Sequence, residues 1–353
     1  MIVPSFHHNK QQGVALITVM LIVAMCVVIA TQMTGRIQMQ MQRSTNISFN
    51  QQAYWYAMGA EAFTKRVLIT AFKEDEEVTH LGQIWAQGET TYPVDFGEIS
   101  GEITDLQSCL NLNALRAPLA NNNAGSGSKK GKANNNQNNN ANSKNKKVPA
   151  RLALETLIIN LQLEGISQFE AESMADALTD WLDEDGRISS AGGAEDDDYA
   201  SREFPYLAAN NHLASVNELR IIEHFTPAVI EAIKPYVCIL PNSDMHKINI
   251  NTLNVEQPEL LQALLGSTLD EAQQILSARG EKGFETKDDF YNLPEVVKLK
   301  SSDDKKDQFV VDSEYFKLKA SASFNNSYFA FNSVMKITNN KYIDVISRTI
   351  GRN

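Results

Sequence analysis

The stretch that most constrains the fold is an uncharged segment near the N-terminus. Residues 14–35 contain no charged side chain, and from Val14 to Ala30 the only polar side chain is Thr18. As an α-helix these 22 residues reach about 33 Å, enough to cross the hydrocarbon core of a bilayer. A backbone in hydrocarbon must satisfy its own polar groups, so a transmembrane helix is expected. A cleaved secretory signal is the alternative, but Met25–Val28 offers no convincing cleavage site.

The residues after the apolar run extend the predicted helix. Glutamines alternate there with methionine and isoleucine, and no proline interrupts them. An apolar stripe then recurs at helical spacing, made of Tyr56, Ala60, Phe63 and Val67. We therefore expect one helix that leaves the membrane, docks on a domain as an amphipathic helix and ends near Phe72.

Strand-forming residues lie on both sides of a central region that has a helical pattern. Residues 91–108 predict one bent strand or a short hairpin. Further strands are predicted at 315–323, 328–338 and 342–349, with Asn339-Asn340 as a hairpin turn. The region between about 110 and 310 is predicted to be helical. The pattern is typical of an α+β fold in which a helical domain is inserted between strands of a small antiparallel sheet.

Charge is unevenly distributed along the chain. The formal net charge is -11, but residues 121–147 hold six lysines, eleven asparagines and no acidic residue, so the remainder carries -17. An acidic chain is a poor match for nucleic acid as its main partner. The insert at 121–147 has no aliphatic side chain larger than alanine, so we expect it to be disordered. A role as a basic binding patch is the alternative.

The helical region contains an internal repeat. Leu110-Asn-Leu-Asn-Ala-Leu115 matches Ile248-Asn-Ile-Asn-Thr-Leu253. Each copy is followed by a turn glycine and a Ser/Thr-x-x-Glu capping box, which are Gly165, Ser167 and Glu170, and then Gly266, Thr268 and Glu271. We interpret them as two helix-hairpin-helix-like units, the first interrupted by the asparagine-rich insert.

Helix-hairpin-helix units often bind DNA, because turn amides contact phosphate. Here the second helices begin with acidic side chains, Glu170 and Glu172 in one unit and Asp270 and Glu271 in the other. These carboxylates repel phosphate, so a packing role is favoured. A membrane-anchored DNA-binding protein of the competence type remains the alternative function.

Lys10-Gln11-Gln12-Gly13 stands directly before the apolar run. This arrangement resembles the type IV pilin-like proteins, whose basic leader is cut after a glycine by a prepilin peptidase. The resemblance implies cleavage between Gly13 and Val14; an ordinary membrane anchor is the alternative. Most such proteins carry glutamate at the fifth mature position, where this chain has Thr18.

The absence of that glutamate, together with the two asparagine motifs, resembles the K-type minor pseudopilins of the type II secretion system. The resemblance implies a pseudopilin fold with a large inserted helical domain. It also implies a place at the tip of the pseudopilus, which the subunit would initiate and cap with the I- and J-type minor pseudopilins. The expected function is export of folded proteins across the outer membrane, from a helix in the inner membrane and a globular part in the periplasm.

The resemblance also divides the chain. The expected parts are a leader at 1–13, a transmembrane segment at 14–35, the docked helix and first strands at 36–109, the inserted domain at 110–310 and the last strands at 311–353. Other expected partners are further pseudopilins and the secreted proteins, with no nucleic acid among them.

A dense acidic segment runs from Asp180 to Asp198, with glycines between its two halves. Oxygen ligands on a flexible loop suit calcium, although the spacing is not that of an EF-hand. The K-type proteins are believed to bind calcium in a similar segment. The resemblance implies structural calcium ligands, which are Asp183, Asp185, Glu195, Asp196 and Asp198, with Asn217 and Glu218 as weaker candidates. A solvated acidic loop is the alternative.

Cys109 and Cys238 each lie beside an end of the helical region, and Cys26 lies in the membrane segment. Cys109 directly precedes the first asparagine motif and Cys238 lies ten residues before the second, so the symmetry of the repeat is expected to bring the two close together. In an oxidising periplasm the first two are expected to form a disulfide; two unpaired buried thiols are the alternative. No sequence motif of a hydrolase, phosphate-binding loop, zinc protease or thiol oxidoreductase is present. We therefore expect a structural protein, and a calcium-dependent periplasmic enzyme is a further alternative.

Overall fold

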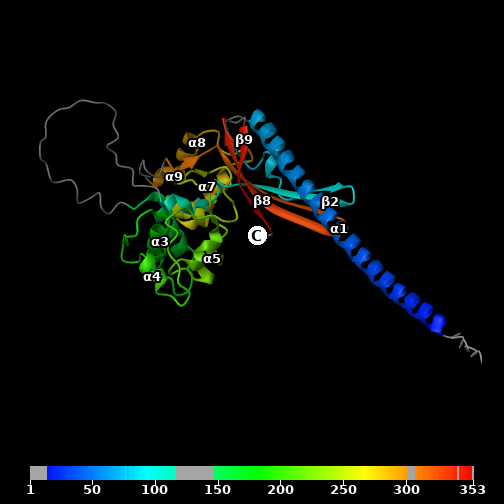
Figure 1. Cartoon of the computed structure of the whole chain (residues 1–353). Coiled ribbons are helices and arrows are strands. Elements are labelled where there is room, and N and C mark those ends of the chain that lie inside the picture. The colour runs from blue at the N-terminus through cyan, green and yellow to red at the C-terminus, as the bar shows by residue number, and fades with distance from the viewer. Residues whose placement is uncertain (1–13, 76, 117–146, 300–306, 340–341, 352–353) are drawn as a thin grey trace, which may run out of the picture.

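The computed structural model describes residues 14–75, 77–116, 147–299, 307–339 and 342–351. A long helix packs on an antiparallel sheet, and a mainly helical block lies between two strands of that sheet in the sequence (Figure 1). The α+β class predicted from the sequence is therefore confirmed. The expected leader at 1–13 and all but the last residue of the expected insert at 121–147 lie outside the described residues.

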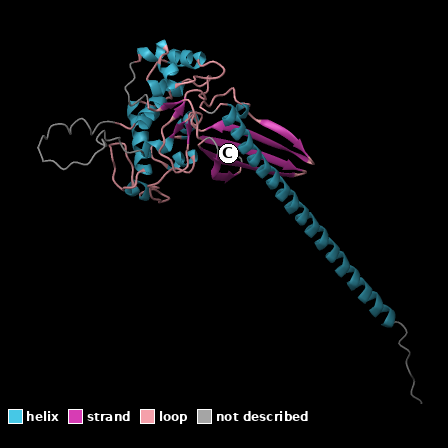
Figure 2. Ribbon diagram, turned by 90° about the horizontal axis from the view of Figure 1, so that it is seen from above, coloured by secondary structure: helices cyan, strands magenta, loops and turns pink. Residues whose placement is uncertain are grey.

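Helix α1, Val14–Glu74, is continuous over 61 residues, about 90 Å at 1.5 Å per residue. Its first part projects away from the rest of the molecule in both views (Figures 1 and 2), and residues 14–35 are exposed. Within the described part of the chain, α1 alone is long and apolar enough to cross a membrane. The predicted single helix is confirmed.

The sheet has five antiparallel strands in the order β1-β2-β7-β8-β9. Their bounds are Thr90–Val94 for β1, Gly97–Asp105 for β2, Tyr315–Phe324 for β7, Ser327–Thr338 for β8 and Tyr342–Ile350 for β9. A short 3-10 helix, η1 at Ile84–Ala86, connects α1 to β1. Of the two structures predicted for 91–108, the hairpin is the one observed, because Val94 pairs with Gly97 across a tight turn.

Helix α1 packs on one face of this sheet through small side chains. Ala53, Ala57 and Ala60 are buried, which lets the helix approach the strands closely, and Leu68 and Phe72 fill the core farther along. Of the predicted apolar stripe, Ala60 is buried, and Tyr56 and Val67 are partly buried against this core. Phe63 is the exception, at 54% exposed, because the strands lie under the alanine face.

A charged side chain is buried beneath α1. Glu61 is 5% exposed, and its carboxylate accepts two hydrogen bonds from Arg348 on β9, at 2.9 and 3.0 Å. It also accepts the Ser333 hydroxyl of β8 at 2.6 Å. Burial alone would raise the pKa of Glu61, but these hydrogen bonds and the arginine charge leave it below its ordinary value. The contact fixes the position of α1 along the last two strands, β8 and β9.

The helical block connects β2 to β7 and lies beside the end of α1 that is far from its apolar N-terminus (Figures 1 and 2). Its first part contains β3 Leu110–Asn111, η2 Leu112–Arg116, α2 Pro149–Asn160, α3 Gln168–Leu182, α4 Asp196–Ala200, η3 Val216–Ile221, α5 Pro227–Ile233 and β4 Val237–Cys238. The second contains β5 Ile248–Asn249, α6 Glu259–Leu265, α7 Leu269–Ala278, α8 Lys287–Tyr291, α9 Pro294–Lys298 and β6 Phe309–Val310. One hydrophobic core runs through both parts.

The two parts, called here the first unit (residues 110–238) and the second unit (residues 248–310), share their construction. Each begins and ends with a two-residue strand, and the two strands pair in parallel, β3 with β4 and β5 with β6. Each has a glycine with positive φ before a capped helix, at 77° for Gly165 and 73° for Gly266. The capping boxes predicted at Ser167 and Thr268 are present.

Candidate functional site

Cleavage between Gly13 and Val14 stays a prediction, because Gly13 lies outside the described residues. Val14 and Thr18 both lie in α1. The hydroxyl of Thr18 donates within its own helix, to the carbonyls of Ala15 at 2.9 Å and Val14 at 3.1 Å. This polar group is therefore satisfied without a partner from another subunit.

The asparagine motifs act as backbone clamps. Asn113 Nδ2 donates to the Leu213 carbonyl, and the Leu213 amide donates back to Asn113 Oδ1, at 3.1 and 2.8 Å. In the second unit Asn251 holds the amide and carbonyl of Phe284 in the same way, at 2.7 and 3.0 Å. The internal repeat of the sequence reveals the asparagine motif, but nothing in the sequence indicates which distant loop each asparagine binds.

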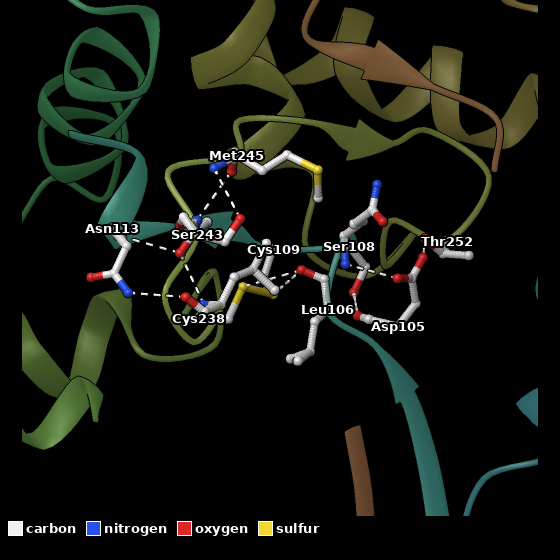
Figure 3. The surroundings of a disulfide bond; sticks show 12 residues. Asp105, Leu106, Ser108, Cys109, Asn113, Cys238, Ser243, Met245 and Thr252 are labelled. Atoms are coloured by element: carbon white, nitrogen blue, oxygen red, sulfur yellow. Dashed lines mark hydrogen bonds between the residues drawn. A yellow bond between two sulfur atoms is a disulfide. The ribbon is translucent and has the colours of Figure 1, made fainter. Parts of the chain in front are cut away.

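A disulfide joins Cys109 to Cys238, with the two Cα atoms 5.8 Å apart (Figure 3). The cysteines meet because β3 pairs with β4, which puts Cys238 opposite Asn111, the second residue after Cys109. Cys26 is a free, exposed cysteine. The crosslink thus closes the first unit at the point where the chain leaves the sheet.

A second fastening lies close by at Asp105, which ends β2 (Figure 3). Its carboxylate accepts from the hydroxyls of Thr252 and Ser313, both at 2.6 Å, and from the amide of Gln107 at 2.7 Å. Burial raises the pKa of Asp105 to about 6, since these hydrogen bonds offset only part of the desolvation. The group ties the sheet to the second unit, and no local sequence pattern indicates it, because its partners come from distant segments.

The acidic segment forms a loop from the end of α3 to the start of α4. Glu195 is 4% exposed, and neither of its carboxylate oxygens has a hydrogen-bond partner among the described residues. Burial, and then repulsion from Asp180, Asp183 and Asp196, raises the pKa of Glu195 to about 7. A buried, unpartnered carboxylate beside other carboxylates is an environment that a cation would stabilise.

The other predicted ligands are placed differently. Asp183 and Asp185 accept backbone amides of their own turn, from Asp185 and Arg187. Asp198 accepts the Glu195 amide, and Asp196 accepts the Ala208 amide at 2.9 Å. No three His, Cys, Asp or Glu side chains in the described residues lie together closely enough to hold a metal ion.

The two weaker candidates, Asn217 and Glu218, lie in η3. The Glu218 carboxylate accepts the amides of Ala214 and Ser215 and so caps that helix. Asp180 begins the acidic segment and was not among the predicted ligands. It is fully buried and accepts the Ser189 amide at 3.2 Å. Its position under the loop is a feature that spacing alone did not reveal.

At the helix N-termini that could contact nucleic acid, the free backbone amides already donate to glutamate carboxylates. Glu170 accepts the Ser167 amide, and Glu271 accepts the Thr268 amide, both at 2.9 Å. A phosphate would have to displace a carboxylate at each turn. This geometry gives no support to the DNA-binding alternative.

The chain matches family models described as Type II secretion system (T2SS), protein K, over residues 108–242 and 248–312. The protein of that name from Aeromonas hydrophila is 39% identical over 281 residues, or 79% of each chain. The one from Dickeya chrysanthemi is 38% identical and covers 97% of this chain and 98% of its own.

A solved structure, "The Crystal Structure of the GspK-GspI-GspJ complex from enterotoxigenic Escherichia coli Type 2 Secretion System", contains a similar chain. The TM-score is 0.72 at 30% identity, covering 88% of this chain and 100% of that one. Taken with the exposed apolar helix, the antiparallel sheet and the inserted helical block, these matches show that the chain is a minor pseudopilin and belongs to the type II secretion system protein K family.

Proposed function

We propose that this minor pseudopilin stands at the tip of the pseudopilus and initiates and caps its assembly together with I- and J-type minor pseudopilins. The observation that carries the proposal is the likeness to the K chain of a GspK-GspI-GspJ complex over the whole length of that chain. The role is structural, in a fibre that exports folded proteins across the outer membrane.

The membrane segment supports a tip position. In pilin-like fibres the fifth mature residue is a glutamate that is thought to pair with a neighbour's N-terminal amine. Thr18 carries no charge and is satisfied inside its own helix, so this subunit needs no neighbour above it. We also propose that the apolar part of α1 lies in the inner membrane and that the sheet and the inserted domain lie in the periplasm, which the exposed apolar N-terminal part of α1 supports. Prepilin peptidase would produce the mature chain by cutting between Gly13 and Val14.

The inserted block supports the same position. It lies beside the far end of α1, and residues between β2 and β7 make up more of the chain than the five strands do (Figure 2). A packed helical fibre leaves little lateral room for such a block, whereas the tip leaves it free.

Co-purification tests the proposal directly. Mature full-length chain in detergent should retain purified I- and J-type minor pseudopilins and should not shift a DNA probe in a gel. Failure to retain either pseudopilin would overturn the tip assignment. A DNA shift at physiological salt would favour the competence-type alternative.

We further propose that the acidic loop holds structural calcium. Glu195 supports this because its two oxygens are buried and unpartnered, with Asp180, Asp183 and Asp196 raising its pKa by repulsion. Asp183, Glu195 and Asp196 would have to move together to hold the ion, because in the described residues no three such side chains lie close enough to do so. Asp185 and Asp198 lie at the exposed side of the loop. Bound calcium would neutralise carboxylates that now repel one another.

Calorimetry tests the calcium proposal. Added calcium should release or absorb heat and raise the melting temperature, since an ion that binds only the folded chain stabilises it by mass action. Glu195→Gln should abolish both effects. Glu271→Gln is the matched control, because it changes a glutamate in the second unit far from the loop. Equal calcium effects in the wild type and Glu195→Gln would contradict the site.

A further inference from the structure

An apolar groove of about 400 Å³ runs along the docked part of α1. Its walls are α1, η1 and the β1-β2 hairpin, and no charged side chain lines it. Trp85, 3% exposed, closes its base, and Phe63 of α1 faces Tyr92 of β1 across it, with the ring centroids 5.8 Å apart. The groove exists because α1 covers β7 and β8 and leaves the first two strands partly uncovered.

The mouth of the groove carries large apolar side chains. Phe63, Tyr92 and Ile84 are 54%, 50% and 51% exposed. Gly59, between Trp55 and Phe63 on the outer side of α1, is exposed, and a Cβ atom there would meet nothing within 4 Å. Solvent-exposed aromatic and aliphatic side chains that converge on an uncharged hollow are typical of a surface that another molecule covers.

The height of the groove above the membrane restricts what can fill it. Gly59 is 24 residues beyond Gly35, the end of the uncharged segment, and therefore about 36 Å along α1 from the membrane. Lipid tails cannot reach that far. A neighbouring subunit anchored in the same membrane by a parallel helix can, because its helix passes the groove at the same height.

We propose that this groove, between α1 and the β1-β2 hairpin, receives apolar side chains from the upright helix of a neighbouring minor pseudopilin. The inference rests on the proposed function and adds to it the surface that makes the contact. The groove runs along α1 past Gly59, Phe63 and Val67, which follow one another at four-residue spacing. A helix lying parallel to α1 presents a ridge with that same spacing. The missing side chain at Gly59 gives the ridge room to approach.

Site-specific photocrosslinking tests the groove in the assembled complex. A photoreactive phenylalanine analogue replaces Tyr92 in the groove or, as the matched control, Tyr342 on the edge strand β9, which is 69% exposed. The complex of full-length chain with I- and J-type minor pseudopilins is then irradiated. Position 92 should crosslink to one of these two proteins, and position 342 should give at least tenfold less product. Crosslinks from 342 alone, or from 92 to a second copy of this chain, would overturn the proposal.

A substitution pair tests the same surface by affinity. Gly59→Gln fills the groove mouth without a clash in the chain's own fold and should weaken retention of the neighbour at least tenfold. Ala62→Gln is the matched control and should leave retention within twofold, since Ala62 lies outside the groove. Equal retention by Gly59→Gln and the wild type would overturn the groove assignment. If the wild type itself retains no partner, the proposed function fails instead.

Discussion

In the first unit Cys109 precedes the asparagine motif and Cys238 lies opposite Asn111; in the second unit Lys247 and Val310 hold the corresponding positions. The first unit is closed by a covalent bond. The second is tied to the sheet by hydrogen bonds around Asp105. Both fastenings lie where the chain passes between the sheet and the inserted block (Figure 3), so the same architecture is held at one border by two kinds of chemistry.

The two links differ in which segments they join. The last strand of the first unit, β4, is followed by the second unit, so the disulfide there joins the two ends of the first unit to each other. The second unit ends at β6, just before the chain returns to the sheet at β7. There Asn249 donates to the carbonyl of Thr79 and to the Ser313 hydroxyl, at 3.0 and 2.8 Å, which joins α1's end, the unit and the returning chain.

Loss of the disulfide should have the largest effect. The double substitution Cys109→Ser with Cys238→Ser opens a loop with a sequence separation of 129 residues and should lower the free energy of unfolding by about 2–5 kcal/mol. Urea unfolding of the full chain in detergent measures it, with Cys26→Ser as the control that should change nothing. If the double variant were as stable as the wild type, the disulfide would not contribute to the stability of the first unit.

Loss of either clamp should cost less, and the two losses should match. Asn113→Leu and Asn251→Leu each leave a buried amide and carbonyl of one remote residue without a partner, so each should lower the free energy of unfolding by about 2–4 kcal/mol. The exposed Asn254→Leu is the control. If one clamp cost several times more than the other, the two units would not be equivalent in energy.

Only the second fastening should depend on pH. Because the pKa of Asp105 is raised from 3.8 to about 6 in the folded chain, the folded state binds the proton more tightly than the unfolded state. Stability from this group should be greatest below pH 4 and should fall by up to about 3 kcal/mol as the pH rises to 6.

Urea unfolding at several pH values measures this slope. Asp105→Asn should reduce it, whereas the double cysteine variant should keep the wild-type slope. An unchanged slope in Asp105→Asn would show that another group causes it.

The capping boxes should have the smallest effect. Ser167→Ala and Thr268→Ala each remove the side-chain acceptor at the start of a helix and should lower the free energy of unfolding by about 1 kcal/mol. Thermal unfolding measures both, and similar values would sharpen the equivalence of the two units. Ser167→Thr and Thr268→Ser serve as controls, because each keeps a hydroxyl that can cap the helix.

The sequence predicted the elements whose signals are local. The uncharged segment predicted α1, runs of strand-forming residues predicted the strands of the sheet, and Ser167 and Thr268 marked two helix starts. Contacts between distant segments could not be predicted in the same way. Glu61 looks like a surface residue of a helix, yet it is buried against Arg348, 287 positions away.

In the candidate site, too, local features could be predicted from the sequence and contacts between distant segments could not. The acidic segment was visible in the sequence, and the burial of Glu195 and Asp180 within it was not. The cysteines were paired from the symmetry of the repeat, whereas the structure brings them together through the β3-β4 pairing. The helical period predicted the docked face of α1 at Ala60, but it could not show that Phe63 lies at the margin of that face and is exposed.

Processing of the leader tests the central claim most directly, because every pseudopilin function requires a mature α1. A strain that carries Gly13→Ala in place of the wild-type protein should retain the leader on an immunoblot and should fail to secrete the substrates of its type II system. Ala62→Gln, which lies far from the cleavage position and outside the groove, should be processed and should secrete normally. Normal secretion from the unprocessed Gly13→Ala chain would contradict the account.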